Sequence, residues 1–439
     1  MAIRRSTPEV GEIAEIVVES LSYSAHAVGR VDGFVVFVSG GVPGDKVLAR
    51  ITAAKKNHAF ADLVEVISAS PHRRQPPCAH FIQGCGGCQW QHIAYKYQLE
   101  SKKEVVRQAL KRIGKLEDIP EMEVYGMEDP LHYRNKLTLF RAENGGMFGT
   151  RRLGSHEVVP IRECPISKPM INALSPMFEG KDISVGSNID KINIRCSDKY
   201  GQVMLLRVYQ QDMPVIAADA DKLANLPGIA SIFHCVESRS GRLRDFTLEY
   251  GKPVIREEVR GIQYKIAPEC FFQVNKSGLE KLVGLIREFA GTGNNLVVDA
   301  HCGVGTFALQ VADISDTVMG MDVSPSAVAL AKSNAEDNGI TNAFFDVGKI
   351  SHLPGGRLGR ATVDLVILDP PRQGCEKADL RELIRWQPEK VIYVSCDPTT
   401  LARDLHELVN AGYQLQKLAL VDMFPMTYHL ETVAFCWHE

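Results

Sequence analysis

Long apolar runs are absent from this chain of 439 residues. No uninterrupted apolar stretch approaches the roughly 20 residues that a membrane-spanning helix needs. The first residues, Met-Ala-Ile-Arg-Arg, also lack the apolar segment of a secretory signal peptide. We therefore expect a cytoplasmic protein that has no membrane partner.

A strong net charge is also absent. Lys and Arg number 50 and Asp and Glu number 53, so the formal net charge is only −3. A chain that coats nucleic acid without selectivity would be strongly basic. Any binding of a polyanion must therefore use local basic patches, for example at Lys55-Lys56 or Arg151-Arg152.

One ordinary hydrophobic core cannot organise a chain of this length, so we expect several domains. Residues 1–67 alternate short β-rich runs with glycine turns, a pattern typical of a small β-barrel. Residues 68–260 begin with a linker and a cysteine-rich segment and continue as a central α+β region. Strands and helices alternate over residues 261–439, which predicts a doubly wound α/β domain. The expected strands cover 12–19, 30–38, 46–51, 60–66, 136–140, 191–196, 203–209 and 231–236, and the expected helices cover 95–113 and 277–290.

The paired Cys-x2-Cys knuckles of many zinc sites are missing. Only one such pair exists, Cys85 and Cys88, which follows Cys78, and the distant Cys164 precedes a proline. In a cytoplasmic protein these thiols are better explained as metal ligands or reactive groups than as disulfides. Four thiolates are enough for a zinc ion or for an iron–sulfur cube, and the residues alone leave both open.

A third glycine is missing from the loop after the apolar run 296–298. The loop contains Gly303 and Gly305, but Ala308 holds the third position of the dinucleotide fingerprint. Further on, Asp322 follows a second apolar run and could accept both hydroxyls of a ribose. A dehydrogenase would use the same features, yet no other dinucleotide signal is present. The loop and this acid instead resemble those of S-adenosylmethionine-dependent methyltransferases.

Two more motifs follow apolar runs in this region. Cys396 comes after residues 391–394 in the motif Ser-Cys-Asp-Pro, and Asp369 begins the motif Asp-Pro-Pro-Arg. Open α/β sheets bind their ligands at the carboxyl ends of the strands, so we expect both residues and the glycine loop to face one crevice. A thiol in that position is a candidate nucleophile.

Four motifs in a fixed order carry a family resemblance. They are Phe-Phe-Gln-Val-Asn at 271–275, Asp-Pro-Pro-Arg-Gln-Gly at 369–374, Ser-Cys-Asp-Pro-x-Thr-Leu-Ala-Arg-Asp at 395–404, and Asp-Met-Phe-Pro-x-Thr-x-His-x-Glu-Thr at 422–432. Together they resemble the RNA uridine-5 methyltransferases, which make 5-methyluridine in ribosomal and transfer RNA. With the barrel and the cysteines included, the resemblance covers essentially the whole chain.

The resemblance implies roles for single residues. Cys396 would add to carbon 6 of the uridine, and Glu431 would be the base that removes the proton from carbon 5. Asp369 would contact the base or the cofactor. The residues expected to contact S-adenosylmethionine are Gln273, His301, Thr306 and Asp322. Two positions depart from the family: His301 replaces an aromatic Phe or Tyr, and Lys349 stands where relatives often have an acid for the adenine.

The barrel and the cysteines resemble parts of the same family. The turn Gly41-Val42-Pro43-Gly44-Asp45 resembles the signature of TRAM domains, which are RNA-binding barrels, although Ser24, Ala25 and Ala27 replace usual glycines. The spacing of Cys78, Cys85, Cys88 and Cys164 resembles the four-iron, four-sulfur (4Fe–4S) site of the 23S ribosomal RNA members. This resemblance favours a cluster over zinc, in a structural or RNA-positioning role.

The expected partner is RNA, with ribosomal RNA as the first choice and the T-loop of transfer RNA as the second. The target uridine must be flipped out of a loop, and we expect residues 1–67 to contribute affinity more than chemistry. Two other classes share part of this pattern: a non-catalytic RNA-binding assembly factor and a cytosine methyltransferase. Cys396, Asp369 and Glu431 together argue against the first, and the motifs around them argue against the second. A monomer is expected.

Overall fold

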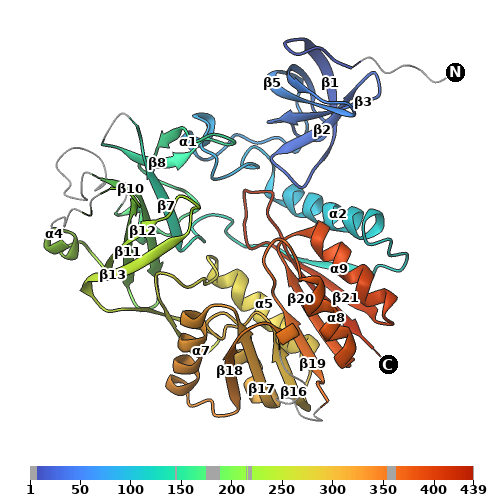
Figure 1. Cartoon of the computed structure of the whole chain (residues 1–439). Coiled ribbons are helices and arrows are strands. Elements are labelled where there is room, and N and C mark those ends of the chain that lie inside the picture. The colour runs from blue at the N-terminus through green and yellow to red at the C-terminus, as the bar shows by residue number, and fades with distance from the viewer. Residues whose placement is uncertain are drawn as a thin grey trace.

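The computed structural model describes residues 7–143, 146–174, 188–213, 215, 220–352 and 362–438. The chain forms an N-terminal barrel, a central sheet and a larger C-terminal sheet covered by helices (Figure 1). No helix in these ranges is both long and apolar enough to cross a membrane.

The N-terminal barrel is closed, with strand order β1-β2-β3-β5-β4. Inward-facing positions such as Val36 and Val38 are fully buried, so the alternating pattern of the sequence becomes an aliphatic interior. The run 30–38 was expected to be one strand but forms two, because Asp32 and Gly33 both have positive φ and make a turn. The strands are β1 (Ile13–Leu21), β2 (His26–Val31), β3 (Phe34–Ser39), β4 (Lys46–Ala54) and β5 (His58–Ser68).

The central region is built on a seven-stranded sheet with order β13-β12-β11-β10-β7-β8-β9. All four strands expected here from the sequence are present as β7, β10, β11 and β12. The elements are α1 (Ala79–Ile82), β7 (Lys136–Arg141), β8 (Phe148–Arg151), β9 (Val158–Pro160), α3 (Pro169–Asn172), β10 (Ile189–Ser197), β11 (Gln202–Gln210), α4 (Ala220–Ala224), β12 (Ile229–Glu237) and β13 (Leu243–Gly251).

The C-terminal part contains a hairpin of β14 (Ile255–Val259) and β15 (Ile262–Ile266) and an eight-stranded sheet with order β18-β17-β16-β19-β20-β22-β21-β6. Strands β16 to β20 are parallel and alternate with helices, as the sequence predicts. The further elements are α5 (Lys276–Ala290), β16 (Asn294–Asp299), α6 (Ala308–Val311), η2 (Ala312–Ile314), β17 (Ser315–Asp322), α7 (Pro325–Asp337), β18 (Ala343–Val347), η3 (Ile350–His352), β19 (Leu365–Leu368), α8 (Lys377–Trp386), β20 (Lys390–Ser395), α9 (Pro398–Asn410), β21 (Gln414–Val421) and β22 (Glu431–Trp437).

Two elements that precede the central sheet in sequence belong to the C-terminal sheet in space. Strand β6 (Met122–Tyr125) pairs in parallel with β21, and α2 (Tyr95–Arg112) lies beside α9 (Figure 1). Leu110 of α2 and Leu405 of α9 share one buried cluster. The expected boundary between residues 260 and 261 therefore does not separate the two sheets, because the second sheet takes a strand from the earlier segment.

The carboxyl ends of the parallel strands meet at one edge of the C-terminal sheet. Asp299 ends β16, Asp322 ends β17, Asp369 follows β19 and Cys396 follows β20. Strand β22 runs antiparallel to β20, so its first residue, Glu431, lies at the same edge. The topology alone brings these candidate residues together.

Candidate active site

Cys396 lies in a tight connection between β20 and α9. The Ser395 hydroxyl donates to the carbonyl of Asp397 at 3.0 Å and accepts from the Asp397 N–H at 3.2 Å. The Asp397 carboxylate caps α9, accepting from the N–H groups of Thr399 and Thr400 at 2.8 and 3.1 Å. A helix N-terminus normally favours a nearby thiolate, but here the capping carboxylate offsets that effect.

The Cys396 thiol is held in its neutral form. Burial raises its pKa to about 12, and the negative charges of Glu431 and Asp369 act in the same direction. The Arg372 guanidinium is the group that opposes them. A thiol with so high a pKa is almost fully protonated near neutral pH, so it must lose its proton when the substrate is bound.

The buried Glu431 and the half-buried Asp369 are neighbouring carboxyl groups beside this thiol. Ser395 is the register partner of Thr432, so the next step along the ladder sets Cys396 opposite Glu431. Burial raises the pKa of Asp369 to about 7, and burial together with the Asp369 charge raises the pKa of Glu431 well above its usual value. Carboxyl groups tuned in this way are suited to exchanging protons near neutral pH.

Arg372 and His429 complete the surroundings of the thiol. An Arg372 Nη2–H donates to His429 Nδ1 at 3.2 Å. Burial and the Arg372 charge together lower the pKa of His429 to about 4, so the neutral imidazole is the acceptor. Both residues belong to motifs visible in the sequence, but only the folded chain brings them together and indicates a role.

The glycine loop after β16 is shaped to approach a ligand. Gly303 and Gly305 have φ of 53° and 87°, and a Cβ at Gly303 would meet no atom within 4 Å. The Gly303 N–H donates to Asp322 Oδ2 at 3.0 Å, and Asp322 Oδ1 accepts from the Ser324 N–H at 2.8 Å. The loop and the acid at the end of the second strand are therefore adjacent, as the sequence predicts.

Polar atoms without partners lie around this loop. His301 Nδ1 and Asp299 Oδ1 are buried and have no hydrogen-bond partner within the protein. Burial raises the pKa of Asp299 to about 8. Buried polar groups normally find a partner, so these atoms fit a site that a polar ligand completes.

Three other positions expected near the cofactor each bond to another segment of the fold. Thr306 lies in the loop, and its carbonyl accepts from the Tyr264 hydroxyl at 3.0 Å. Gln273 is buried on the segment before α5, where its carbonyl accepts from Asn135 Nδ2 at 3.4 Å. Lys349 is paired with Glu376 at 2.5 Å. An acid therefore does lie near the position where Lys349 departs from the family pattern.

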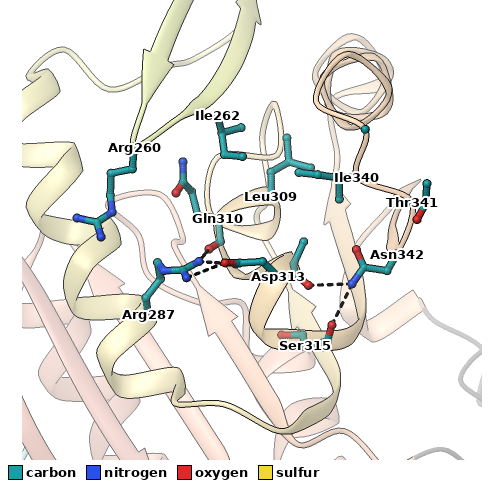
Figure 2. A pocket seen from close by; sticks show the side chains of 12 residues that line it. Arg260, Ile262, Arg287, Leu309, Gln310, Asp313, Ser315, Ile340, Thr341 and Asn342 are labelled. Carbon is teal, nitrogen blue, oxygen red and sulfur yellow. Dashed lines mark hydrogen bonds and ion pairs between the residues drawn. The ribbon is translucent and has the colours of Figure 1, made fainter.

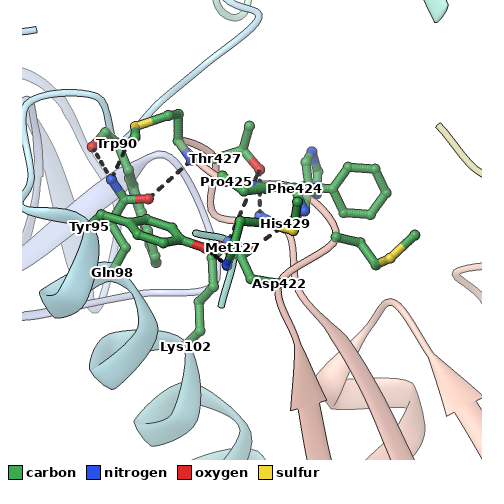
Figure 3. A network of polar contacts seen from close by, with 12 residues as sticks. Trp90, Tyr95, Gln98, Lys102, Met127, Asp422, Phe424, Pro425, Thr427 and His429 are labelled. Carbon is green, nitrogen blue, oxygen red and sulfur yellow. Dashed lines mark hydrogen bonds and ion pairs between the residues drawn. The ribbon is translucent and has the colours of Figure 1, made fainter. Parts of the chain in front are cut away.

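Helix α2 holds the segment that leads from β21 to Glu431 (Figure 3). Lys102 Nζ donates to Asp422 Oδ1 at 2.6 Å and to the Phe424 carbonyl at 3.2 Å. Gln98 accepts from the Met426 N–H at 3.1 Å. Because this segment also carries His429, α2 fixes one side of the site from outside the predicted C-terminal domain.

The four candidate metal ligands line one cavity next to the central sheet: Cys78, Cys85, Cys88 and Cys164. Cys85 Sγ lies 2.8 Å from Thr150 Oγ1. Asn172 of α3 fixes Cys164 by accepting from its N–H at 2.9 Å and donating to its carbonyl at 3.0 Å. Within the described ranges, no group of three or more His, Cys, Asp or Glu side chains is arranged to hold a metal ion. The cysteines are gathered as predicted, and the metal stays a prediction.

A separate pocket lies at the amino ends of the parallel strands, opposite the end that carries Cys396 (Figure 2). Ser315, which begins β17, lines it, whereas Asp322, which lies next to the cofactor loop, ends the same strand. Arg287 pairs with Asp313 at 2.5 Å, and Asn342 donates to the Ser315 carbonyl at 2.9 Å. These polar groups are largely satisfied by each other, so the pocket shows no sign of a catalytic site.

The doubly wound sheet, the open glycine loop and the acid at the end of the second strand fit the class of protein expected from the sequence, the S-adenosylmethionine-dependent methyltransferases. The model of the family tRNA (Uracil-5-)-methyltransferase matches residues 94–438, and the TRAM domain model matches residues 8–64. The chain therefore belongs to the tRNA (uracil-5-)-methyltransferase family and carries a TRAM barrel.

Relatives extend the match to nearly the whole chain. An uncharacterized RNA methyltransferase of Thermosynechococcus vestitus is 37% identical over 97% of this chain and 98% of its own length. A second, from Clostridium acetobutylicum, is 36% identical over 95% of each chain. The solved structure of Pyrococcus abyssi tRNA (uracil-54, C5)-methyltransferase in complex with S-adenosyl-L-homocysteine is 26% identical, with a TM-score of 0.76 over 96% of this chain and 100% of that one.

These matches confirm the predicted class of enzyme. The chain is an S-adenosylmethionine-dependent RNA methyltransferase of the uracil-5 class. They also confirm the barrel as a TRAM domain. The roles of single residues, the iron–sulfur cluster and the RNA target stay predictions.

Proposed function

We propose that this enzyme methylates carbon 5 of one uridine in large-subunit (23S) ribosomal RNA through a covalent bond between Cys396 Sγ and carbon 6. The observation that carries the proposal is the meeting of Cys396, Asp369 and Glu431 at one edge of the sheet, next to the cofactor loop. Carbon 5 of uridine is a poor nucleophile, and addition of a thiolate to carbon 6 converts the ring into an enolate that is reactive at carbon 5.

The reaction requires two proton transfers, and these indicate the role of each side chain. Cys396 must first lose its proton; the ionised carboxylate of Asp369 takes it, and the Arg372 guanidinium stabilises the thiolate that forms. After methylation, carbon 5 still bears its hydrogen. Glu431 takes that proton, the electrons of the C–H bond re-form the double bond between carbons 5 and 6, and the thiolate of Cys396 leaves.

S-adenosylmethionine supplies the methyl group when it is bound. The open face of Gly303, the unpartnered His301 Nδ1 and the Asp322 carboxylate support a binding site at the loop. We propose that Asp322 accepts from the ribose hydroxyls, and that Gln273, His301, Thr306 and Asp369 complete the site.

We propose that Cys78, Cys85, Cys88 and Cys164 hold a 4Fe–4S cluster in a structural or RNA-positioning role. The four thiols line one cavity, and four thiolates are the ligand set that such a cube requires. Anaerobic purification with iron and sulfide analysis and a visible spectrum tests this; a colourless protein containing zinc would contradict it.

The barrel offers an outer face that suits unpaired RNA. Phe37 and Phe60 stack with ring centroids 5.4 Å apart, and His58 contacts both rings edge-on. The side chain of His26 on β2 meets Phe60 on β5 across the intervening strand β3. These four side chains are half-exposed and lie outside the aliphatic interior, so they form a platform on which bases can stack. We call this group the aromatic face.

Mapping the methylated nucleotide tests the proposal and its alternative. Total RNA is incubated with labelled S-adenosylmethionine and either wild-type enzyme or Cys396→Ala. Label at one uridine of 23S ribosomal RNA, absent with Cys396→Ala, is the expected result. Label in a transfer RNA would support the second candidate, which the likeness to the P. abyssi enzyme favours. Label that persists with Cys396→Ala would exclude the covalent mechanism.

A further inference from the structure

The barrel contacts the catalytic turn through one side chain. Tyr23, in the connection between β1 and β2, donates its hydroxyl hydrogen to the backbone carbonyl of Cys396 at 2.5 Å. Its ring also stands edge-on to Tyr428, with centroids 5.6 Å apart and an interplanar angle of 89°. Tyr428 lies three residues before Glu431, so Tyr23 contacts both segments that carry the proposed chemistry.

Tyr23 is held as a neutral donor in a fixed position. Burial raises the pKa of its phenol well above the usual value, and the charges of Asp397 and Cys396 raise it further. The Ser22 hydroxyl donates to the His26 carbonyl at 2.6 Å, and the Ser24 hydroxyl accepts from the His26 N–H at 3.1 Å. These bonds tie the connection to the first residue of β2, so the barrel sets where the phenol lies.

We infer that Tyr23 is a positioning residue for the nucleophile, so that the TRAM barrel completes the catalytic centre as well as binding RNA. The inference rests on the proposed role of Cys396. The Ser395–Asp397 bonds hold the turn from within, and the Tyr23 hydroxyl holds its outer carbonyl. Fixing that peptide fixes the direction of the Cα–Cβ bond and so limits where Sγ can lie relative to the substrate, which is the geometric requirement for attack at carbon 6.

The same connection links RNA binding to the thiol. His26 belongs to the aromatic face and lies three residues after Tyr23. RNA that stacks on this face therefore contacts the segment that orients Cys396. Removing the barrel should lower kcat in addition to the loss of affinity expected from the sequence.

The test is Tyr23→Phe in the full-length enzyme, which removes one hydroxyl and keeps the ring. The loss of one hydrogen bond predicts a fall in kcat of about five- to tenfold, with less than a twofold change in the KM for RNA. The rate at which a 5-fluorouridine transcript forms its adduct with Cys396 should fall by the same factor. A structural role alone would lower the melting temperature without slowing the adduct step. Tyr97→Phe is the control, because it removes a hydroxyl from a ring that stacks on His72, and it should match wild type.

The outcomes separate the inference from the proposed function. If Tyr23→Phe matches wild type in kcat and in adduct formation, or if only KM rises, the inference is wrong while the covalent mechanism stands. If Tyr97→Phe slows the adduct step as much as Tyr23→Phe, the effect is not specific to the Cys396 turn and the inference is also wrong. If wild type itself forms no adduct at Cys396 while it methylates RNA, the proposed function and the inference both fail.

Discussion

Lys102 Nζ lies 2.6 Å from Asp422 Oδ1, and neither side chain is exposed to solvent. Burial lowers the pKa of Lys102, and the Asp422 charge opposes that shift. A buried pair of this kind contributes little beyond what two apolar side chains would, but removal of one partner leaves a buried charge without compensation. Here the pair joins α2 to the segment that leads to Glu431, so its loss should affect both stability and chemistry.

Lys102→Met should therefore lower the free energy of unfolding by about 3–5 kcal/mol, measured by urea denaturation. The double variant Lys102→Met with Asp422→Leu should recover much of that loss, because no unpaired charge remains. Lys103→Met is the matched control: Lys103 pairs with the exposed Glu121, and such surface pairs contribute little to stability. Equal losses for Lys102→Met and Lys103→Met would contradict this account.

Glu431→Gln should stop the reaction after methyl transfer. Without a base to take the proton from carbon 5, the bond between Cys396 and carbon 6 cannot be broken, and turnover should fall by about 10²–10⁴-fold. Natural RNA should then remain covalently bound to the protein on a denaturing gel. Turnover by Glu431→Gln at the wild-type rate would assign the base to another residue, with Asp369 the first to examine.

The stability of the cofactor-free enzyme should fall as pH rises from about 4 to 8. The folded-state pKa of Asp299 is about 8 and that of Asp369 about 7, whereas an unfolded aspartate titrates near about 3.9. In that interval the folded state keeps protons that the unfolded state has lost, so the two groups favour folding at low pH and lose that contribution as pH rises through their folded pKa values. Asp299→Asn should flatten the pH dependence in urea titrations. A variant curve parallel to that of wild type would show that Asp299 is ionised in the folded protein.

The aromatic face should contribute to RNA affinity. Phe37→Ala and Phe60→Ala each remove a stacking ring, which is worth about 1–3 kcal/mol per base, so the KM for RNA should rise by about tenfold while kcat stays close to wild type. Val17→Ala is the control, since Val17 is exposed on β1, outside the aromatic face. A steady-state assay with the mapped RNA separates the two constants. If KM is unchanged in both phenylalanine variants, the RNA follows another path.

The sequence predicts the site best where a residue with a reactive side chain directly follows an apolar run. Cys396, Asp369 and Asp322 each follow an apolar run, so the parallel sheet alone brings them to one edge. The partner of a strand is harder to predict. Residues 122–125 carry no signal that they pair with β21, because periodicity predicts an element and not its neighbour.

Contacts between distant segments were not predictable from either pattern or motif. Tyr23 and Cys396 are 373 positions apart, and an ordinary tyrosine in a loop predicts nothing about a thiol. Arg372 and His429 stood in recognised motifs, yet their hydrogen bond depends on how two strand ends are arranged. Side-chain electrostatics around Cys396 likewise exist only in the folded chain.

Strand β6 is an edge strand of the C-terminal sheet, and this position limits how the enzyme can be synthesised and truncated. The ribosome produces this strand long before its partner β21, so the sheet can be completed only once nearly the whole polypeptide has emerged. A fragment that starts at residue 261 would leave the edge of β21 uncovered and Asp422 without its lysine. The catalytic half should consequently express poorly by itself, and a truncated gene that begins upstream of α2 should be the smallest one to yield a stable product.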